Sequence, residues 1–186
     1  MSTIEEVVAK IPDWKQKKVK ITPLSGGLTN SNFRVDVGST PYFVRIPGAS
    51  TDLLAINREN EHYNSQAANE AGVAPKVLYY LPEYCAMVLE FMTAKTMSKE
   101  SLNKRGMPTR MAQAIKKLHA GPRFLLDFNM FRLTEYYLEI CKERQITIPD
   151  GYMDRVPIFA RIEQAMLVNP LPNVPCNNDL LAENYI

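Results

Sequence analysis

The order of the expected elements assigns this chain to the α+β class, with a small antiparallel sheet lobe followed by the first part of a mostly helical lobe. Apolar alternation and turn residues fill the first half of the 186 residues, whereas helical spacing dominates after Met92. Strands that come first and helices that come later are typical of segregated α+β layers. We therefore expect a sheet lobe over residues 1–92 and the beginning of a helical lobe over residues 93–186.

The sheet is predicted from five short apolar runs that turn residues separate. Glycine-containing turns at residues 25–27 and 38–41 divide the first three runs, which we expect to pair as an antiparallel meander. A turn through Pro82 and Glu83 joins the last two runs. The expected strands are residues 19–24, 32–37, 42–46, 77–80 and 86–91.

Helices are predicted around and after this sheet. The third and fourth runs are separated by residues 53–71, which have helical spacing and end at Gly72. The N-terminal segment carries two Glu and no long apolar run, and so indicates an amphipathic helix and not a signal peptide. Apolar β-like residues return only at 174–176. In the second half, the expected helices are residues 110–120, 131–144 and 152–168.

Composition argues against several classes of function. Twenty-two basic and twenty acidic residues give a formal charge of +2, which provides no electrostatic case for nucleic acid as a partner. No stretch approaches the roughly 20 apolar residues that span a bilayer. The three cysteines, Cys85, Cys141 and Cys176, lie far apart, so we expect buried free thiols and a reducing, cytoplasmic location. Two histidines and scattered cysteines do not indicate a structural zinc site.

The strongest functional signal is the spacing of Asp179 and Asn184. In kinase-type catalytic loops an Asp takes or orients the proton of the attacking hydroxyl, and an Asn five positions later binds Mg²⁺. A loop without function can also contain Asp and Asn, so this pair by itself leaves both interpretations open. Such sites use a further acidic metal ligand on the next strand, and no such residue follows within these 186 positions.

Two other features precede this pair in the order that a bilobal kinase requires. Residues 25–32 place paired glycines between two expected strands, where the backbone can approach a phosphate closely, although an ordinary hairpin is the alternative. Arg45 lies in an apolar strand and needs a partner if it is buried. Glu61 on the following helix is a candidate partner, as in kinases that hold a basic side chain against nucleotide phosphates; the alternative is that Arg45 faces solvent at a sheet edge.

A third feature is the apolar run of residues 88–92, which leads into the expected junction between the two lobes. Exposed backbone groups at such a junction can bind an adenine edge, and a plain core strand is the alternative. Each of these features has a plain structural alternative. Together they occur in the order that a bilobal kinase requires, and this order favours a phosphotransferase.

Several motifs together resemble a known family. They are SGGLTNSNF, YFVRIPG, NRENE at 57–61, GVAPKV at 72–77, VLEFM, LH at 118–119 and PCNNDLLAEN. With these motifs the chain is similar to the choline/ethanolamine kinase family, in particular its bacterial LicA-like branch, within the aminoglycoside-phosphotransferase and protein-kinase-like superfamily. The resemblance extends from residue 18 to residue 186.

The resemblance implies a protein-kinase-like bilobal fold and an enzyme that uses ATP and Mg²⁺ to phosphorylate a small-molecule acceptor, the hydroxyl of choline or a similar amino alcohol. Asp179 would be the catalytic base and Asn184 the magnesium ligand, while Glu61, in preference to Glu59, would position Arg45 against the phosphates. The implied nucleotide-binding set is Ser25, Gly26, Gly27, Leu28, Thr29, Asn30, Arg45, Glu61, Glu90 and Met92.

Two departures from the family pattern qualify these expectations. Asn177 stands where the family usually has a His two residues before the catalytic Asp. The family's second metal-binding Asp and much of its acceptor pocket are expected after position 186, so we expect a C-terminally truncated chain that is inactive alone. Other acceptors of the superfamily, such as thiamine, a sugar or an aminoglycoside, remain alternatives, as does a pseudokinase-like binding protein.

Overall fold

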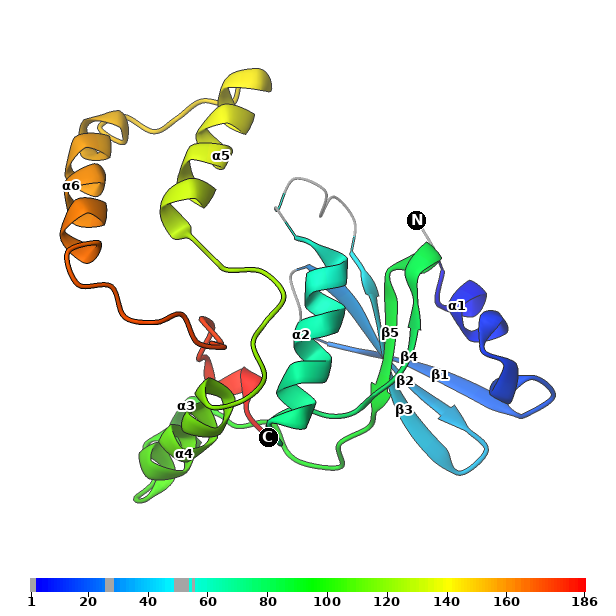
Figure 1. The fold of residues 1–186 in the computed structure, drawn as a ribbon. Coiled ribbons are helices and arrows are strands. Elements are labelled where there is room, and N and C mark those ends of the chain that lie inside the picture. The colour runs from blue at the N-terminus through cyan, green and yellow to red at the C-terminus, as the bar shows by residue number, and fades with distance from the viewer. Residues whose placement is uncertain (1–2, 26–28, 49–53, 55) are drawn as a thin grey trace. The chain divides into compact units, whose positions relative to one another are not determined.

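The computed structural model describes residues 3–25, 29–48, 54 and 56–186. The chain forms two compact units. Unit 1 comprises Met1–Asp52, Ile56–Leu125 and Val174–Ile186, and unit 2 comprises Leu53–Ala55 and Leu126–Asn173. The α+β class expected from the sequence is confirmed, because unit 1 combines a five-stranded antiparallel sheet with helices (Figure 1). The predicted boundary between two lobes near residues 92–94 stays a prediction.

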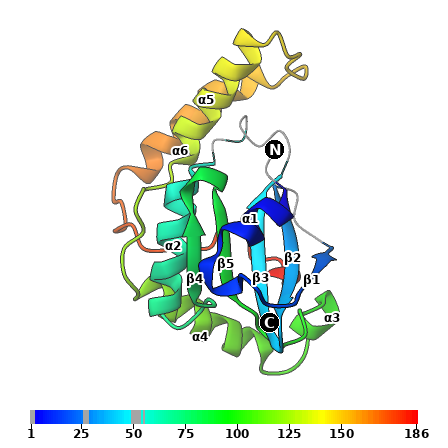
Figure 2. The same cartoon turned by 90° about the vertical axis from the view of Figure 1, so that its right-hand side faces the viewer.

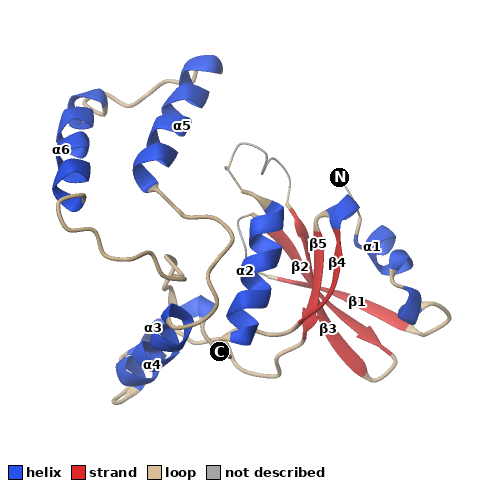
Figure 3. Ribbon diagram, viewed as in Figure 1, coloured by secondary structure: helices blue, strands red, loops and turns tan. Residues whose placement is uncertain are grey.

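The sheet of unit 1, whose strands are red in Figure 3, has the strand order β1-β2-β3-β5-β4, with all neighbours antiparallel. All five predicted strands are present, and the first three form the expected meander. The central strand β3 pairs with β2 on one side and β5 on the other. The strands are β1 Val19–Leu24, β2 Asn30–Val37, β3 Thr40–Pro47, β4 Val77–Leu81 and β5 Ala86–Glu90, with a 3₁₀ turn at Pro82–Tyr84 between the last two.

Strand alternation gives the sheet one apolar face and one mixed face. Val44 lies opposite Val88 in the β3–β5 register, and neither side chain is exposed to solvent. The next residue of β3, Arg45, points to the other face, opposite Asn32 of β2 and Met87 of β5. A charged residue is therefore presented from the middle of the sheet, although its strand is mostly apolar.

The N-terminal segment covers the apolar face. Helix α1 (Ile4–Lys10) and the 3₁₀ turn η1 (Pro12–Trp14) lie across the sheet in Figure 2. Trp14 packs on Tyr42 with ring centroids 4.9 Å apart. The Tyr79 hydroxyl donates a hydrogen bond to Asp13, and this bond raises the pKa of Tyr79 to about 12. The core of this layer is Ile4, Val7, Ile11, Trp14, Val35, Val37, Val44, Ile46, Leu81, Ala86 and Val88.

Helix α2 (Arg58–Glu70) lies against the mixed face, where His62 stacks on Tyr80 of β4 with ring centroids 4.0 Å apart. The side chain of Asn57 caps the helix by accepting from the Asn60 N–H at 2.8 Å. The predicted helix over 53–71 is confirmed from Arg58 onward, while residues 53 and 55 lie outside the described residues. Gly72, the predicted stop, has a φ of +71°, a left-handed conformation that favours glycine.

Unit 1 also contains α3 (Lys99–Leu102), α4 (Met107–His119) and the 3₁₀ turn η5 (Ala182–Asn184). Helix α4 was predicted from residue 110 and begins three residues earlier. The prediction of a strand-like segment at residues 174–176 is wrong, because these residues form no strand. Pro175 occupies its middle and is buried, and a proline has no N–H to donate to a strand partner.

Unit 2 contains α5 (Met130–Glu143), the 3₁₀ turn η4 (Met153–Arg155) and α6 (Val156–Met166). The two α-helices match the predictions for 131–144 and 152–168, although the second is shorter than expected. Phe131 packs on Phe159 with ring centroids 4.6 Å apart, and Arg132 Nη2 lies 2.7 Å from Glu163 Oε1.

Two findings concern the whole described chain. Within its described residues, no helix combines the length and the apolar character that crossing a bilayer requires. The expectation of buried thiols is wrong: Cys176 is exposed, and Cys85 and Cys141 are half-buried. Cys176 lies in the irregular segment after α6 and before η5.

Candidate functional site

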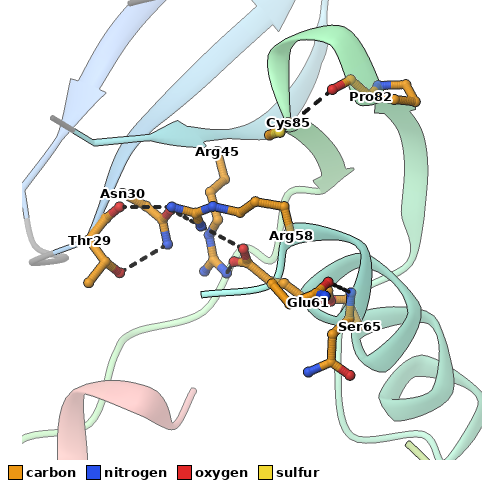
Figure 4. A network of polar contacts seen from close by, with 10 residues as sticks. Thr29, Asn30, Arg45, Arg58, Glu61, Ser65, Pro82 and Cys85 are labelled. Carbon is orange, nitrogen blue, oxygen red and sulfur yellow. Dashed lines mark hydrogen bonds and ion pairs between the residues drawn. The ribbon is translucent and has the colours of Figure 1, made fainter. Parts of the chain in front are cut away.

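An ion pair between β3 and α2 lies on the mixed face of the sheet. Arg45 Nη1 is 3.1 Å from Glu61 Oε1, and their side chains are 34% and 21% exposed (Figure 4). The predicted pairing is thus confirmed, and the alternative of an Arg45 that faces solvent at a sheet edge is wrong because β3 is the central strand. Glu59, the other candidate carboxylate, is exposed.

Glu61 holds a second arginine with its other carboxylate oxygen. Arg58 Nη1 is 2.7 Å from Glu61 Oε2, and the Arg58 side chain is only 13% exposed. The backbone of Glu61 is fixed within α2, since its carbonyl accepts from the Ser65 hydroxyl at 2.8 Å. A single carboxylate therefore orients two guanidinium groups at the N-terminal end of α2.

The same Arg58 reaches the glycine-containing loop. Its Nη1 donates to Asn30 Oδ1 at 2.8 Å, and its Nη2 lies 3.5 Å from the Thr29 carbonyl oxygen. That oxygen also accepts from the Gly48 N–H at 3.0 Å. A Cβ added at Gly48 would lie 3.2 Å from the Thr29 oxygen, so glycine at the end of the RIPG motif permits this close approach.

The remaining residues of the predicted loop are only partly described. Ser25 follows β1 and is exposed. Gly26, Gly27 and Leu28 lie outside the described residues. The structure thus shows how the Thr29–Asn30 end of the loop is held, and contact of the loop with phosphate stays a prediction.

Sequence reasoning missed Arg58, although a signal was present. Arg58 precedes Glu61 by three positions on one helix, a spacing at which opposite charges meet. Its contact with Asn30 had no comparable signal, because it depends on how α2 docks on β2. The NRENE motif therefore contains a further member of the site.

The predicted linker, Glu90 to Met92, begins at the last residue of β5. The Glu90 N–H donates to the Lys76 carbonyl at 2.9 Å, and the Met92 carbonyl accepts from the Ala94 N–H at 3.0 Å. Met92 is 45% exposed. Between them, the Phe91 ring lies beneath the guanidinium of Arg34, 4.8 Å from its centroid. Adenine binding by this segment stays a prediction.

Arg34 is itself held in place on β2. Its Nε and Nη2 lie 2.9 Å and 2.8 Å from Asp36 Oδ1. The hydrogen bond to Asp36 raises the pKa of Arg34. The aromatic linker residue Phe91 is therefore covered by a fixed cation.

The predicted catalytic segment folds back on itself. Asn184 Nδ2 donates to the backbone oxygen of Asp179 at 2.8 Å and to its Oδ2 at 2.9 Å. The Asp179 N–H donates to Asn177 Oδ1 at 2.9 Å. Asn177 thus supports Asp179 through a hydrogen bond, while the Asp179 side chain is exposed and available to a ligand.

The end of this segment is fastened within unit 1. The Met97 N–H donates to the Tyr185 carbonyl at 2.9 Å, and Ala182 is 3% exposed. The predicted catalytic segment and the Arg45–Glu61 pair therefore belong to one compact unit, although more than one hundred residues separate them in the chain.

The donor set of this segment fits Mg²⁺. The amide nitrogen of Asn184 is used by Asp179, so the amide oxygen is the end that can bind a cation. Magnesium takes oxygen ligands and usually keeps waters and substrate phosphates in its shell. In the part of the chain that the structure describes, no three His, Cys, Asp or Glu side chains form a metal-binding group, so a magnesium ion here would need phosphate and water ligands.

A five-stranded sheet with a strand arginine paired to a helix carboxylate, followed by a loop in which an Asn holds an Asp, defines the kinase-like class of fold. The family model of choline/ethanolamine kinase matches residues 21–186. The chain belongs to the choline/ethanolamine kinase family.

Similar proteins agree with this assignment. Protein LicA of Haemophilus influenzae is 24% identical over 168 residues, which are 87% of this chain and 48% of that protein. A choline/ethanolamine kinase family protein from Mesorhizobium loti superposes with a TM-score of 0.75 at 35% identity, over 95% of this chain and 57% of its own.

Two LicA structures share the fold. The choline kinase LicA from Streptococcus pneumoniae has a TM-score of 0.76 at 21% identity, and LicA in complex with AMP has 0.73 at 20%. Each alignment covers 96% of this chain and 62% of the LicA chain. This chain spans about half the length of the curated relative that it matches.

Proposed function

We propose that the protein is an ATP-dependent phosphotransferase that phosphorylates the hydroxyl of choline or a similar small amino alcohol. Family membership supports the class of reaction. The observation that carries the proposal is the double hydrogen bond from the Asn184 amide to Asp179, because it fixes a carboxylate beside an oxygen donor for a cation.

In this proposal Asp179 orients the acceptor hydroxyl and accepts its proton as the oxygen attacks phosphorus. Asn184 keeps the Asp179 carboxylate in place and offers its amide oxygen to the metal. Asn177 holds the Asp179 backbone through its side-chain oxygen. As the acceptor oxygen bonds to the γ-phosphorus of ATP, the bond from that phosphorus to ADP breaks and ADP leaves, and a bound Mg²⁺ would supply positive charge for the phosphate oxygens.

Arg45 binds the phosphates, and Glu61 sets the direction of its guanidinium. Ser25, Gly26, Gly27, Leu28, Thr29 and Asn30 form the loop above the phosphates, and the segment from Glu90 to Met92 binds the adenine. An AMP complex of the similar LicA supports nucleotide use at this fold.

The proposal also covers the organisation and the location of the enzyme. The sheet lobe is residues 1–92, and the helical lobe begins at residue 93. The enzyme acts in the cytoplasm.

The acceptor is proposed from the relatives. Similar structures are described as a choline kinase and as an ethanolamine kinase from Plasmodium vivax. These relatives favour an amino alcohol over thiamine, a sugar or an aminoglycoside. The alternatives remain outcomes of the test.

The test is an acceptor screen on the full-length protein with ATP and Mg²⁺, in which ADP formation and phosphorylated product are both measured. We expect turnover with choline or ethanolamine, and loss of turnover in Asp179→Asn. Turnover only with thiamine, a sugar or an aminoglycoside would overturn the acceptor assignment. ATP binding without transfer to any acceptor would instead support the pseudokinase alternative.

A further inference from the structure

Arg58 is less exposed than either member of the Arg45–Glu61 pair, with 13% of its side chain accessible against 34% and 21%. A guanidinium withdrawn from water to this extent needs polar partners. Its partners include groups from two parts of the chain, residues 29–30 at the start of β2 and the first turn of α2. Arg58 therefore connects the glycine-containing loop to the carboxylate that orients Arg45 (Figure 4).

The geometry of this connection is short and charge-assisted. Arg58 Nη1 donates to Asn30 Oδ1 at 2.8 Å and to Glu61 Oε2 at 2.7 Å. The second nitrogen, Nη2, is directed to the Thr29 carbonyl. A planar guanidinium can address several acceptors at once in fixed directions, whereas a lysine ammonium is a single point charge.

The charges of this cluster also suit an anionic ligand. Glu61 supplies one negative charge, and Arg45 and Arg58 supply two positive charges. The three side chains therefore keep a formal excess of one positive charge. With Arg58 occupied by Glu61 and the loop, Arg45 is the member that remains more exposed.

We propose that Arg58 is a positioning residue of the nucleotide site, which sets the affinity for ATP by holding the Thr29–Asn30 end of the loop against Glu61. This inference rests on the proposed function. Arg58 acts through the loop and through Arg45, so it places both groups that approach the phosphates without touching the reacting atoms.

The first test compares Arg58→Ala and Arg58→Lys in the full-length protein. We expect Arg58→Ala to raise the Kd and KM for ATP about tenfold, the effect of losing charge-assisted hydrogen bonds. At saturating ATP, kcat should change much less, because Asp179 and Asn184 keep their own contacts. Arg58→Lys should recover only part of the affinity, since it retains the charge and loses the planar fork.

The second test is a double-mutant cycle between Arg58 and Asn30, read as ATP affinity. Asn30→Ala removes the loop side of the connection and leaves the Arg58–Glu61 pair in place. If Arg58 acts through Asn30, the two substitutions together should cost less than the sum of their separate effects. Additive losses of ATP affinity would overturn the proposed action of Arg58 through Asn30. If Arg58→Ala does not fold, the same cycle can be run with Arg58→Lys.

A third measurement needs no nucleotide. Amide hydrogen exchange of a peptide that covers residues 29–37 should accelerate in Arg58→Ala and stay unchanged in the matched control Arg132→Ala. Arg132 also contacts two carboxylates, those of Glu135 and Glu163, but it belongs to unit 2. The control should also keep its ATP affinity.

The outcomes separate the two proposals. Normal ATP binding that is unaffected by every Arg58 substitution would overturn the positioning role alone. Absence of ATP binding in the unsubstituted protein would overturn the proposed function and, with it, the role of Arg58 in nucleotide affinity. In that case faster exchange in Arg58→Ala would identify a purely structural connection.

Discussion

The side-chain amide of Asn184 donates to Asp179 twice, once to its backbone oxygen at 2.8 Å and once to its carboxylate at 2.9 Å. Asn184 therefore contacts both the backbone and the carboxylate of Asp179, while Asn177 adds a separate contact to the Asp179 N–H. The two residues that the kinase spacing singled out form a single structural group.

Substitutions of Asp179 or Asn184 should lower the rate of the chemical step. We expect Asp179→Asn to reduce kcat at least about a hundredfold, because it removes the group that accepts the proton. Asn184→Ala should also reduce kcat, because it removes both hydrogen bonds to Asp179 and the amide oxygen proposed to bind Mg²⁺. Steady-state kinetics of the full-length protein measure both effects. The exposed neighbour Asn178 provides the control Asn178→Ala, and equal losses in all three variants would contradict this assignment.

Asn177 should support the catalytic loop through its single described contact with Asp179. A hydrogen bond of this kind contributes about 1 kcal/mol, which corresponds to a roughly fivefold change in rate if it is lost in the transition state. We expect Asn177→Ala to lower kcat by about that factor with little change in the KM for ATP. Asn177→His, which can still accept from the N–H, should retain or raise turnover. An alanine variant with unaltered kcat would show that this contact is dispensable.

Gly121 should be required for the contact between the ends of α2 and α4. A Cβ built at Gly121 lies 2.7 Å from the Ala71 Cβ and 3.1 Å from the Leu118 carbonyl oxygen, distances that force the helix ends apart. We expect Gly121→Ala to lower the free energy of unfolding by about 1–3 kcal/mol, the usual effect of overpacking. Urea unfolding measures this change.

The compensating variant decides the cause of that loss. Ala71→Gly removes the opposing methyl group, so the double variant should recover part of the stability that Gly121→Ala loses. If the double variant loses as much free energy of unfolding as the two single variants lose together, the effect does not come from this contact.

His62 should make stability fall in mild acid. Burial against Tyr80 lowers the pKa of His62, and the nearby Glu59 carboxylate opposes the shift only in part. The folded state then binds a proton at His62 less readily than the unfolded chain does. The contribution of neutral His62 to the free energy of unfolding is therefore fully present above about pH 6.5, and it is lost as the pH falls through the lower folded pKa.

Urea unfolding between about pH 5 and pH 8 tests this dependence. His62→Phe keeps an aromatic ring on Tyr80 and removes the titration, so its free energy of unfolding should decline less toward acid pH. Replacement of the other histidine, His119→Gln, serves as the control and should leave the His62-dependent slope in place. Parallel curves for the parent protein and His62→Phe would refute the assignment.

The sequence was sufficient for the features that local pattern determines. Alternation and turn residues predicted the five strands of the described sheet, and a lone cation in an apolar strand predicted the Arg45–Glu61 pair. That pair could be predicted because an isolated charge near the core requires an opposite charge nearby. The roles of Arg45, Asp179 and Asn184 in catalysis stay predictions.

Features that depend on tertiary docking were missed. The contact of Arg58 with Asn30 crosses from α2 to β2, and no local periodicity encodes such a contact. Residues 174–176 are apolar enough to resemble a strand, yet a strand also requires a partner edge. Exposure of Cys176 has the same origin, because burial is decided by what packs on a residue and not by its type alone.

The division of unit 1 along the chain sets the order in which the proposed site is completed during synthesis. The sheet and the arginine cluster belong to the first 125 residues, whereas Asp179 and Asn184 belong to a segment that is made only after unit 2. Domains generally begin to fold from the N-terminus while the chain is being made. A ribosome-bound chain that stops before Val174 would therefore carry the groups proposed to bind ATP but neither member of the catalytic pair, and nucleotide affinity should appear earlier in synthesis than phosphoryl transfer.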